Sequence, residues 1–204
     1  MLVLTADHLI NRGANRDCYR HPDDPNRCIK LNRSDGQGTH DNTNAIEYEH
    51  HTALSDRLGE AFYQHAPRGY GLVETNLGKG PCFELIRDSD GALSTRLSQY
   101  ITEANCTPQH AIELIDRLYD FVMANNIGLF DVNPYNLLVR RGAEGQTDLI
   151  VIDWKGPKAL REFIPASRLI PRFARMKKAR RFQRLREQVK QMMRDYSVSH
   201  TSSS

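Results

Sequence analysis

Short apolar runs, broken by turn-forming residues, dominate the first part of the chain. They occur within 9–31, where His-Pro-Asp-Asp and Asp-Pro-Asn are turn signals, and again at 68–75 and 80–86. Such runs predict β-strands. Residues 45–62 instead carry apolar side chains at helical spacing, which predicts a helix between the strands. The polar, Gly- and Asn-rich segment 32–44 predicts a mobile loop.

The strongest helical pattern lies at 107–126. Thr107 suits the N-cap, Pro108 suits the first turn, and apolar residues recur along one face. A weaker helical pattern precedes it at 94–102. Two short strand patterns follow it and flank the turn Gly-Ala-Glu-Gly-Gln, which predicts a β-hairpin.

The order of these patterns is strands, helix, strands, helix, loop, hairpin and helices. It predicts an α+β fold with two lobes, a β-rich lobe at 1–87 and a reduced helical lobe at 88–197. Residues 198–204 are rich in serine and are predicted to be a disordered tail.

Composition adds limits on the class of protein. Apolar residues make up 39% and charged residues 26% of the 204 residues, as in a soluble globular protein. No apolar run is long enough for a transmembrane helix, and the N-terminus lacks the pattern of a secretory signal. The four cysteines form no Cys-x-x-Cys pair, so we expect reduced thiols in a cytoplasmic protein.

Charge is distributed unevenly along the chain. Residues 158–194 contain 13 basic residues and two acids, a net charge of +11, so the remainder carries −8 of the total of +3. A segment this basic is expected to seek an anionic surface. That surface could be lipid headgroups, nucleic acid, an acidic partner or the acidic remainder of the same chain.

The basic segment also carries an apolar stripe after Pro171. The spacing of three to four residues predicts a helix, and its apolar positions are 170, 173, 176, 182, 185, 189 and 192. One interpretation packs the stripe on the helical lobe and leaves the charges in water. Another lays the helix on an anionic membrane, near an envelope precursor. Nucleic-acid binding is less favoured, because no recognised nucleic-acid fold accompanies the charge.

Residues 131–136, with the strand pattern after them, carry the strongest chemical signal. Asp131 lies on a loop, where a carboxylate can orient and deprotonate a hydroxyl. Asn136 precedes the first strand of the predicted hairpin and Asp153 follows the second strand. The two residues therefore lie at the open end of the hairpin and can converge on one metal ion. Their oxygen ligands suit Mg²⁺, which bridges ATP phosphates. The spacing matches the protein-kinase loop D-x-K-P-x-N, with Asn133 at the lysine position; the alternative is a turn with two capping acids.

Lys30 lies inside the apolar run Cys-Ile-Lys-Leu, where an ammonium group is costly to bury without an anion. In kinases the corresponding lysine pairs with a helix glutamate and reaches the ATP phosphates. Glu47 is the first candidate partner, because Leu54 and Leu58 recur on its side of the helix; Glu49 is the alternative. Lys30 could also be an edge-strand lysine that reaches water.

A phosphate-binding loop is expected around Gly13, the one glycine that remains of the G-x-G-x-x-G pattern. Backbone amides around this residue could cradle phosphate, with Arg12 or Arg16 adding charge. A lone glycine is also usual in an ordinary turn.

These stretches resemble the YrbL family, the PhoP regulatory network group of small kinase-like proteins. The resemblance covers roughly residues 8–160 and is carried by 13–31, 46–58, 72–80, 133–139 and 151–156. It implies a fold similar to those of protein kinases and aminoglycoside phosphotransferases. It also implies Glu47, rather than Glu49, as the partner of Lys30.

The chain departs from the kinase pattern at several positions. Leu129 and Phe130 stand where His-Arg precede the catalytic aspartate, so no basic pocket for an activation-loop phosphate is expected. Trp154 and Lys155 replace Phe-Gly after Asp153, and no Ala-Pro-Glu motif follows. A platform for peptide substrates is therefore not expected, and a sugar or another small hydroxyl acceptor is favoured.

Together these features predict a phosphotransferase that moves the γ-phosphate of ATP to a hydroxyl acceptor with the help of Mg²⁺. The predicted residues are Asp131, Lys30 and Glu47 for catalysis, Gly13, Arg16, Lys30, Glu84 and Ile86 for nucleotide binding, and Asn136 and Asp153 for the metal. A nucleotide-responsive pseudokinase and an unrelated α+β interaction module are the alternatives. The predicted location is the cytoplasm, with contact to the inner membrane face as an option.

Overall fold

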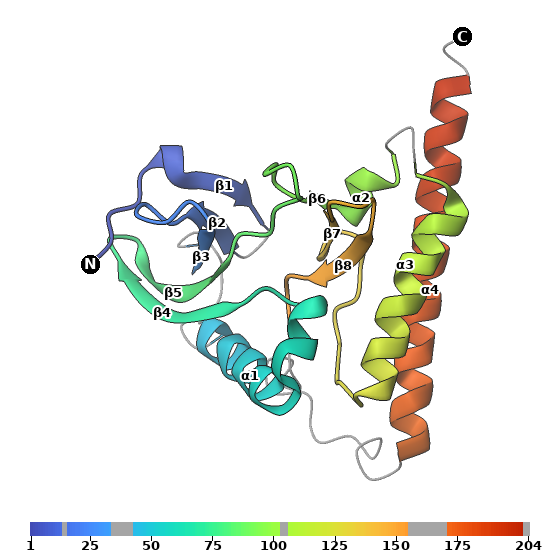
Figure 1. Ribbon diagram of the computed structural model, residues 1–204, viewed down its shortest axis with the longest axis horizontal. Helices are drawn as coiled ribbons and strands as arrows, with labels where there is room; N and C mark the ends of the chain where they lie inside the picture. The colour runs from blue at the N-terminus through green and yellow to red at the C-terminus, as the bar shows by residue number, and fades with distance from the viewer. Residues whose placement is uncertain (14–15, 34–42, 103–105, 155–170, 202–204) are drawn as a thin grey trace. The chain divides into compact units, whose positions relative to one another are not determined.

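The computed structural model describes residues 1–13, 16–33, 43–102, 106–154 and 171–201 (Figure 1). The chain forms two compact units, Met1–Ile86 and Arg87–Ser204. Their boundary falls one residue before the boundary expected from the sequence. The first unit holds the larger sheet and the second holds the two longest described helices, so the predicted α+β fold class is confirmed.

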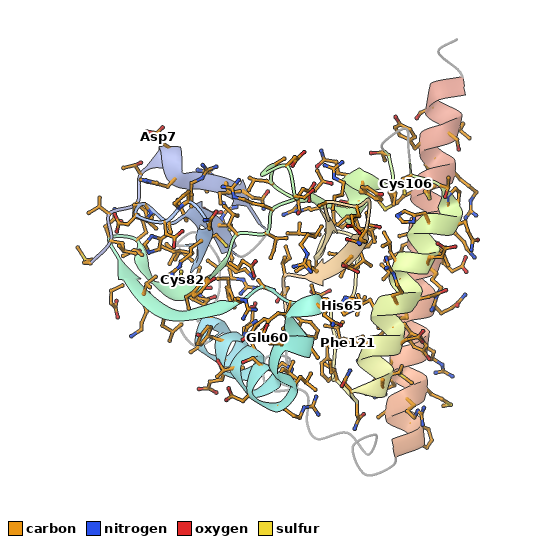
Figure 2. The ribbon with its side chains drawn as sticks, in the orientation of Figure 1. Asp7, Glu60, His65, Cys82, Cys106 and Phe121 are labelled. Atoms are coloured by element: carbon orange, nitrogen blue, oxygen red, sulfur yellow. The ribbon has the colours of Figure 1, made fainter. Side chains whose placement is uncertain are left out.

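The first unit is built on an antiparallel sheet of five strands in the order β1-β2-β3-β5-β4. The strands are β1 (Leu9–Arg12), β2 (Arg16–Arg20), β3 (Arg27–Asn32), β4 (Gly69–Thr75) and β5 (Gly78–Glu84). The sheet buries an apolar cluster that includes Ile29, Leu31 and Cys82, the last of which is labelled in Figure 2. Because side chains alternate along a strand, Lys30 projects to the opposite face from Ile29 and Leu31.

The helix of the first unit is shorter than predicted. α1 (Thr43–Leu58) ends where Gly59 takes a φ of 57°, and the chain continues as a 3-10 helix, η2 (Gly59–Gln64). Glycine adopts this left-handed conformation at little cost, so it is a common place for a helix to stop. The predicted loop at 32–44 lies largely outside the described residues, since 34–42 are not described.

α1 buries polar as well as apolar side chains on one face. Glu47, His51 and Leu54 are 1%, 2% and 5% exposed and follow one another at helical spacing. Nε2 of His51 lies 2.8 Å from the carbonyl oxygen of Pro67, and its ring packs edge-on against Phe62 and Phe83. This contact holds α1 against the segment that leads into β4.

Burial lowers the pKa of His51 from 6.5 to about 4, with smaller contributions in the same direction from Lys30 and His50, although the hydrogen bond to Pro67 opposes the shift. The folded protein therefore holds this ring neutral, whereas the unfolded chain takes up a proton below pH 6.5. Stability should be lost as pH falls from 6.5 towards 4, by about 3 kcal/mol in total. Urea unfolding at pH 7 and pH 5 tests this. His51→Gln should reduce the loss of unfolding free energy between pH 7 and pH 5. If the variant loses as much stability as the wild type, His51 is not the cause of the pH dependence.

The four cysteines, Cys18, Cys28, Cys82 and Cys106, are free thiols. A hydrogen bond with Cys18, together with burial, raises the pKa of Cys28 well above its usual value. This thiol therefore stays protonated at neutral pH and is a poor nucleophile.

In its described residues, the second unit combines a small sheet with three helices. The sheet has the order β6-β7-β8 and the helices include the two longest of the described chain. Its elements are β6 (Thr95–Arg96), α2 (Leu97–Tyr100), α3 (Pro108–Ala124), β7 (Leu137–Arg141), β8 (Thr147–Val151) and α4 (Pro171–Thr201). The weak helical pattern at 94–102 is thus a short strand followed by a single helical turn.

The N-terminus of α3 has the cap that the sequence predicts. The side-chain oxygen of Thr107 accepts a hydrogen bond of 3.1 Å from the backbone amide of His110, and Pro108 occupies the first turn. This side chain satisfies one of the amides that a helix start leaves without a partner. The apolar face of α3 is buried, as its spacing predicts.

α4 runs alongside α3 in Figure 1 and is in contact with it. Phe182 packs edge-on against Tyr119 of α3, and Phe182, Leu185 and Val189 are at most 1% exposed. The helix continues to Thr201, so the prediction of disorder is wrong for residues 198–201; 202–204 lie outside the described chain. Every helix in the described ranges is too short or too polar to span a bilayer.

Candidate functional site

The first unit brings Lys30 and Glu47 together. Nζ of Lys30 lies 3.5 Å from Oε1 of Glu47, and it also lies 4.8 Å from the ring centroid of Phe83. Lys30 comes from β3 and Glu47 from the buried face of α1, which packs on the same sheet. Glu49, the alternative partner, is exposed. The structure therefore contains the ion pair between strand and helix that the sequence favoured.

A second cation joins this pair. Nη1 of Arg16 contacts Oε2 of Glu47 and lies 3.5 Å from Oδ1 of Asn44. In the antiparallel register Arg16 lies opposite Asn32, so Arg16 and Lys30 project from the same face of the sheet. Both carboxylate oxygens of Glu47 thus bind cations. The sequence predicted that Arg16 adds positive charge near the ATP phosphates. In the structure its guanidinium contacts Glu47 and Asn44 of α1.

Gly13 closes the hairpin between β1 and β2. Its amide donates a 2.8 Å hydrogen bond to the carbonyl oxygen of Arg16, and a Cβ at this position would lie 2.7 Å from that oxygen. The requirement for glycine here comes from the close approach of its backbone to the carbonyl oxygen of Arg16. The Gly13 amide is therefore already used and does not fit the predicted role of phosphate donor; residues 14–15 lie outside the described chain.

Gly80 is a contributor to which the sequence interpretation gave no role at the site. It lies in β5, where a Cβ would overlap the carbonyl oxygen of Lys30. Only a residue without a side chain lets β5 approach the strand that carries this lysine so closely. A glycine inside a strand pattern is the signal that could have identified it.

The side chain of Glu84, at the end of β5, is used within the first unit. Its Oε2 accepts a 3.0 Å hydrogen bond from the backbone amide of Arg68, and its own amide donates to the carbonyl of Arg68. The next amide, that of Leu85, donates to Asn26. Ile86 is buried at 3% exposed and is the last residue of the unit. The backbone carbonyl of Glu84 accepts a hydrogen bond of 3.8 Å from Sγ of Cys28, so the polar groups of Glu84 already have partners within the unit.

The second unit holds Asp131, Asn136 and Asp153. Asn133, at the lysine position of the kinase pattern, shapes the loop: its Nδ2 donates 2.7 Å to Oδ1 of Asp131, and its Oδ1 accepts from the amide of Tyr135 at 3.0 Å. The amide of Asn136 donates back to the carbonyl of Asn133. This short network sets the direction of the Asp131 carboxylate.

Asn136 and Asp153 lie at the same end of the β7–β8 hairpin. Leu137 pairs with Val151, and the amide of Ile152 donates 3.1 Å to the carbonyl of Asn136. One amide and one carboxylate oxygen fit a Mg²⁺ ion that keeps waters and phosphates as its other ligands. Within the described ranges, no group of three or more His, Cys, Asp and Glu residues could hold a metal by itself.

α4 supports the loop that leads into Asp131. The guanidinium of Arg181 lies 4.6 Å from the ring centroid of Phe130, and its Nη1 donates 3.4 Å to the carbonyl of Leu129. Lys178 donates 2.8 Å to Oδ1 of Asn126 at the end of α3. Phe130 stands at the arginine position of the kinase pattern. The guanidinium beside this position comes from Arg181, which is far away in the sequence. No local signal in the sequence indicates this contact.

Residues 2–190 match the family model described as PhoP regulatory network protein YrbL. A protein of Escherichia coli (strain K12) named Uncharacterized protein YrbL is 30% identical over 162 residues, which cover 78% of this chain and 76% of that protein. A protein of Shigella flexneri with the same name shows the same values. The crystal structure of the Mycobacterium tuberculosis PknI kinase domain aligns with 72% of this chain at 14% identity and a TM-score of 0.43; the chain spans 57% of that domain.

Proposed function

Because the chain belongs to the YrbL family of PhoP regulatory network proteins, we propose that it is a kinase-like phosphotransferase that uses ATP and Mg²⁺. The observation that carries the proposal is the contact between Lys30 and Glu47, whose carboxylate is almost fully buried. Burying an ion pair is costly, and replacing it with apolar residues often stabilises a protein. The first unit already has an apolar cluster, so this ion pair is not needed to form a core. Its presence is explained if Lys30 is positioned to bind an anionic ligand.

In this proposal each residue has a separate task. Lys30, oriented by Glu47, binds the α- and β-phosphates of ATP, and Arg16 adds positive charge at the same carboxylate. Asp131, aligned by Asn133, orients the acceptor hydroxyl and takes its proton late in the transfer. Asn136 and Asp153 would hold Mg²⁺, which supplies neutralisation of phosphate charge. The rate enhancement then comes from placing the reactants in line and from electrostatic stabilisation.

The proposed acceptor is a small hydroxyl compound such as a sugar or an envelope glycan precursor. The missing Ala-Pro-Glu motif and the absence of the usual His-Arg before Asp131 support it, because peptide kinases use these features to organise their substrate. We place the reaction in the cytoplasm, where ATP and reduced thiols coexist.

A pseudokinase is the second candidate. The observation that favours it is the hydrogen bond from the Gly13 amide to Arg16, which occupies a backbone donor that a phosphate loop would use. A protein of this kind would bind nucleotide, or a partner, without transferring phosphate. Release or transfer of labelled phosphate from γ-labelled ATP separates the two candidates.

Nucleotide binding tests the site directly. A thermal-shift titration should show stabilisation by ATP only when Mg²⁺ is present, by about 2.7 kcal/mol at a ligand concentration of 100 Kd. Asp153→Asn should remove the dependence on Mg²⁺, because the substitution removes the charged metal ligand while preserving side-chain shape. Asp148→Asn, on β8 of the same hairpin, is the matched control and should behave as the wild type. A Mg²⁺ titration that Asp153→Asn leaves unchanged would exclude Asp153 as a ligand.

A further inference from the structure

The first turns of α4 expose two large apolar side chains. Phe173 is 51% and Met176 is 47% exposed, whereas Phe182 and Leu185 further along the same helix are at most 1% exposed. In Figure 1 this end of α4 extends beyond α3. The apolar stripe of the helix is therefore divided, with one part packed on its own unit and one part in water.

The basic residues of α4 divide in a related way. Lys178, Arg181 and Arg186 contact Asn126, Leu129 and Asp116 of the second unit. The side chains of a second set are exposed and form no hydrogen bond or ion pair with another described residue. This set is Arg175, Lys177, Arg180 and Arg184.

Helical spacing places five of these six exposed residues on one surface, and Arg175 lies on another side of the helix. Positions 173, 176, 180 and 184 follow at intervals of three or four residues, and Lys177 lies beside them. We call Phe173, Met176, Lys177, Arg180 and Arg184 the docking face. Glu187, the nearest acid along the helix, pairs with Lys190 and accepts from Gln183 instead.

We propose that the docking face binds the surface of an anionic lipid bilayer. The cations meet the headgroup phosphates, and each Lys or Arg close to such a surface strengthens binding about fivefold. Phe173 and Met176 enter the boundary between headgroups and acyl chains, where their apolar surface leaves water. A nucleic acid would attract the charges but offers no apolar layer in which Phe173 and Met176 could be buried. The combination of cationic and apolar side chains therefore favours a lipid surface.

The same helix would transmit docking to the candidate site. Arg181, adjacent to the docking face, holds the carbonyl of Leu129 and stacks on Phe130, directly before Asp131. A bilayer bound to α4 would therefore lie within one helix of the loop proposed to receive the acceptor. This proposal stands independently of the proposed function, because it requires no catalysis.

Sedimentation with vesicles tests the proposal. The full chain should bind vesicles of equimolar phosphatidylcholine and phosphatidylglycerol, and should not bind phosphatidylcholine alone. Arg180→Glu with Arg184→Glu should weaken binding at least about tenfold because it reverses two charges on the docking face. Phe173→Ser with Met176→Ser should also weaken it about tenfold. Leu77→Ser changes an apolar residue of similar exposure, 50%, in the turn between β4 and β5; it is the matched control and should bind as the wild type.

A second measurement reports insertion itself. In Met176→Trp the added indole should shift its emission to shorter wavelength on anionic vesicles, above the constant signal of buried Trp154. Circular dichroism melts check that each variant remains folded. The proposal is overturned by equal binding to both vesicle types, by full binding of the Phe173→Ser, Met176→Ser variant, or by an unshifted emission in bound protein.

Discussion

Asp131→Asn should reduce phosphate release from γ-labelled ATP at least about 100-fold, the usual contribution of a positioned general base. The asparagine keeps an oxygen that can accept the hydrogen bond from Nδ2 of Asn133, now 2.7 Å long, so the loop should retain its shape. It cannot take a proton from a hydroxyl. Nucleotide affinity should stay near the wild-type value, because Asp131 is not assigned to the phosphates or the metal.

Two comparisons make this result interpretable. Asp120→Asn changes an exposed carboxylate on α3 and should leave turnover intact. A Mg²⁺-dependent titration with ATP should give the same midpoint for wild type and Asp131→Asn. Wild-type turnover in Asp131→Asn would remove this residue from the mechanism. A wild-type protein that binds Mg·ATP but releases no phosphate would instead support the pseudokinase.

Glu47→Gln should lower the free energy of unfolding by about 3 kcal/mol, near the lower end of the cost of breaking a buried ion pair. The carboxylate is 1% exposed and contacts both Lys30 and Arg16. Glutamine has nearly the same shape but carries no charge, so two largely buried cations lose their shared anion. The melting temperature should fall by about 6 to 12 °C for a chain of this size.

Glu49→Gln is the matched control for this experiment. Glu49 lies two residues further along α1 and is exposed, so its loss should change stability by less than about 0.5 kcal/mol. The two variants have the same change in charge and in helix propensity, which isolates the contribution of the buried contacts. Equal melting temperatures for both variants would show that the contacts of Glu47 add nothing to stability.

The sequence alone predicted the features that depend on neighbouring residues. Apolar spacing identified α3 and the two strands of the β7–β8 hairpin, and the identities of Thr107 and Pro108 located the start of α3. The positions of Asp131, Asn136 and Asp153 before and after the predicted hairpin were likewise evident from the sequence. These features follow from hydrophobic period, capping and turn chemistry, which act over a few residues.

The tertiary structure alone decided which distant side chains meet. Helical spacing favoured Glu47 but left Glu49 open, and the packing of α1 on the sheet buries only the former. Nothing local indicated that Arg16 would share this carboxylate or that α4 would carry Arg181 to Phe130. Such contacts depend on the direction of each side chain and on how elements far apart in the chain pack. Spacing within one segment describes the faces of that segment, but not the neighbour that covers them.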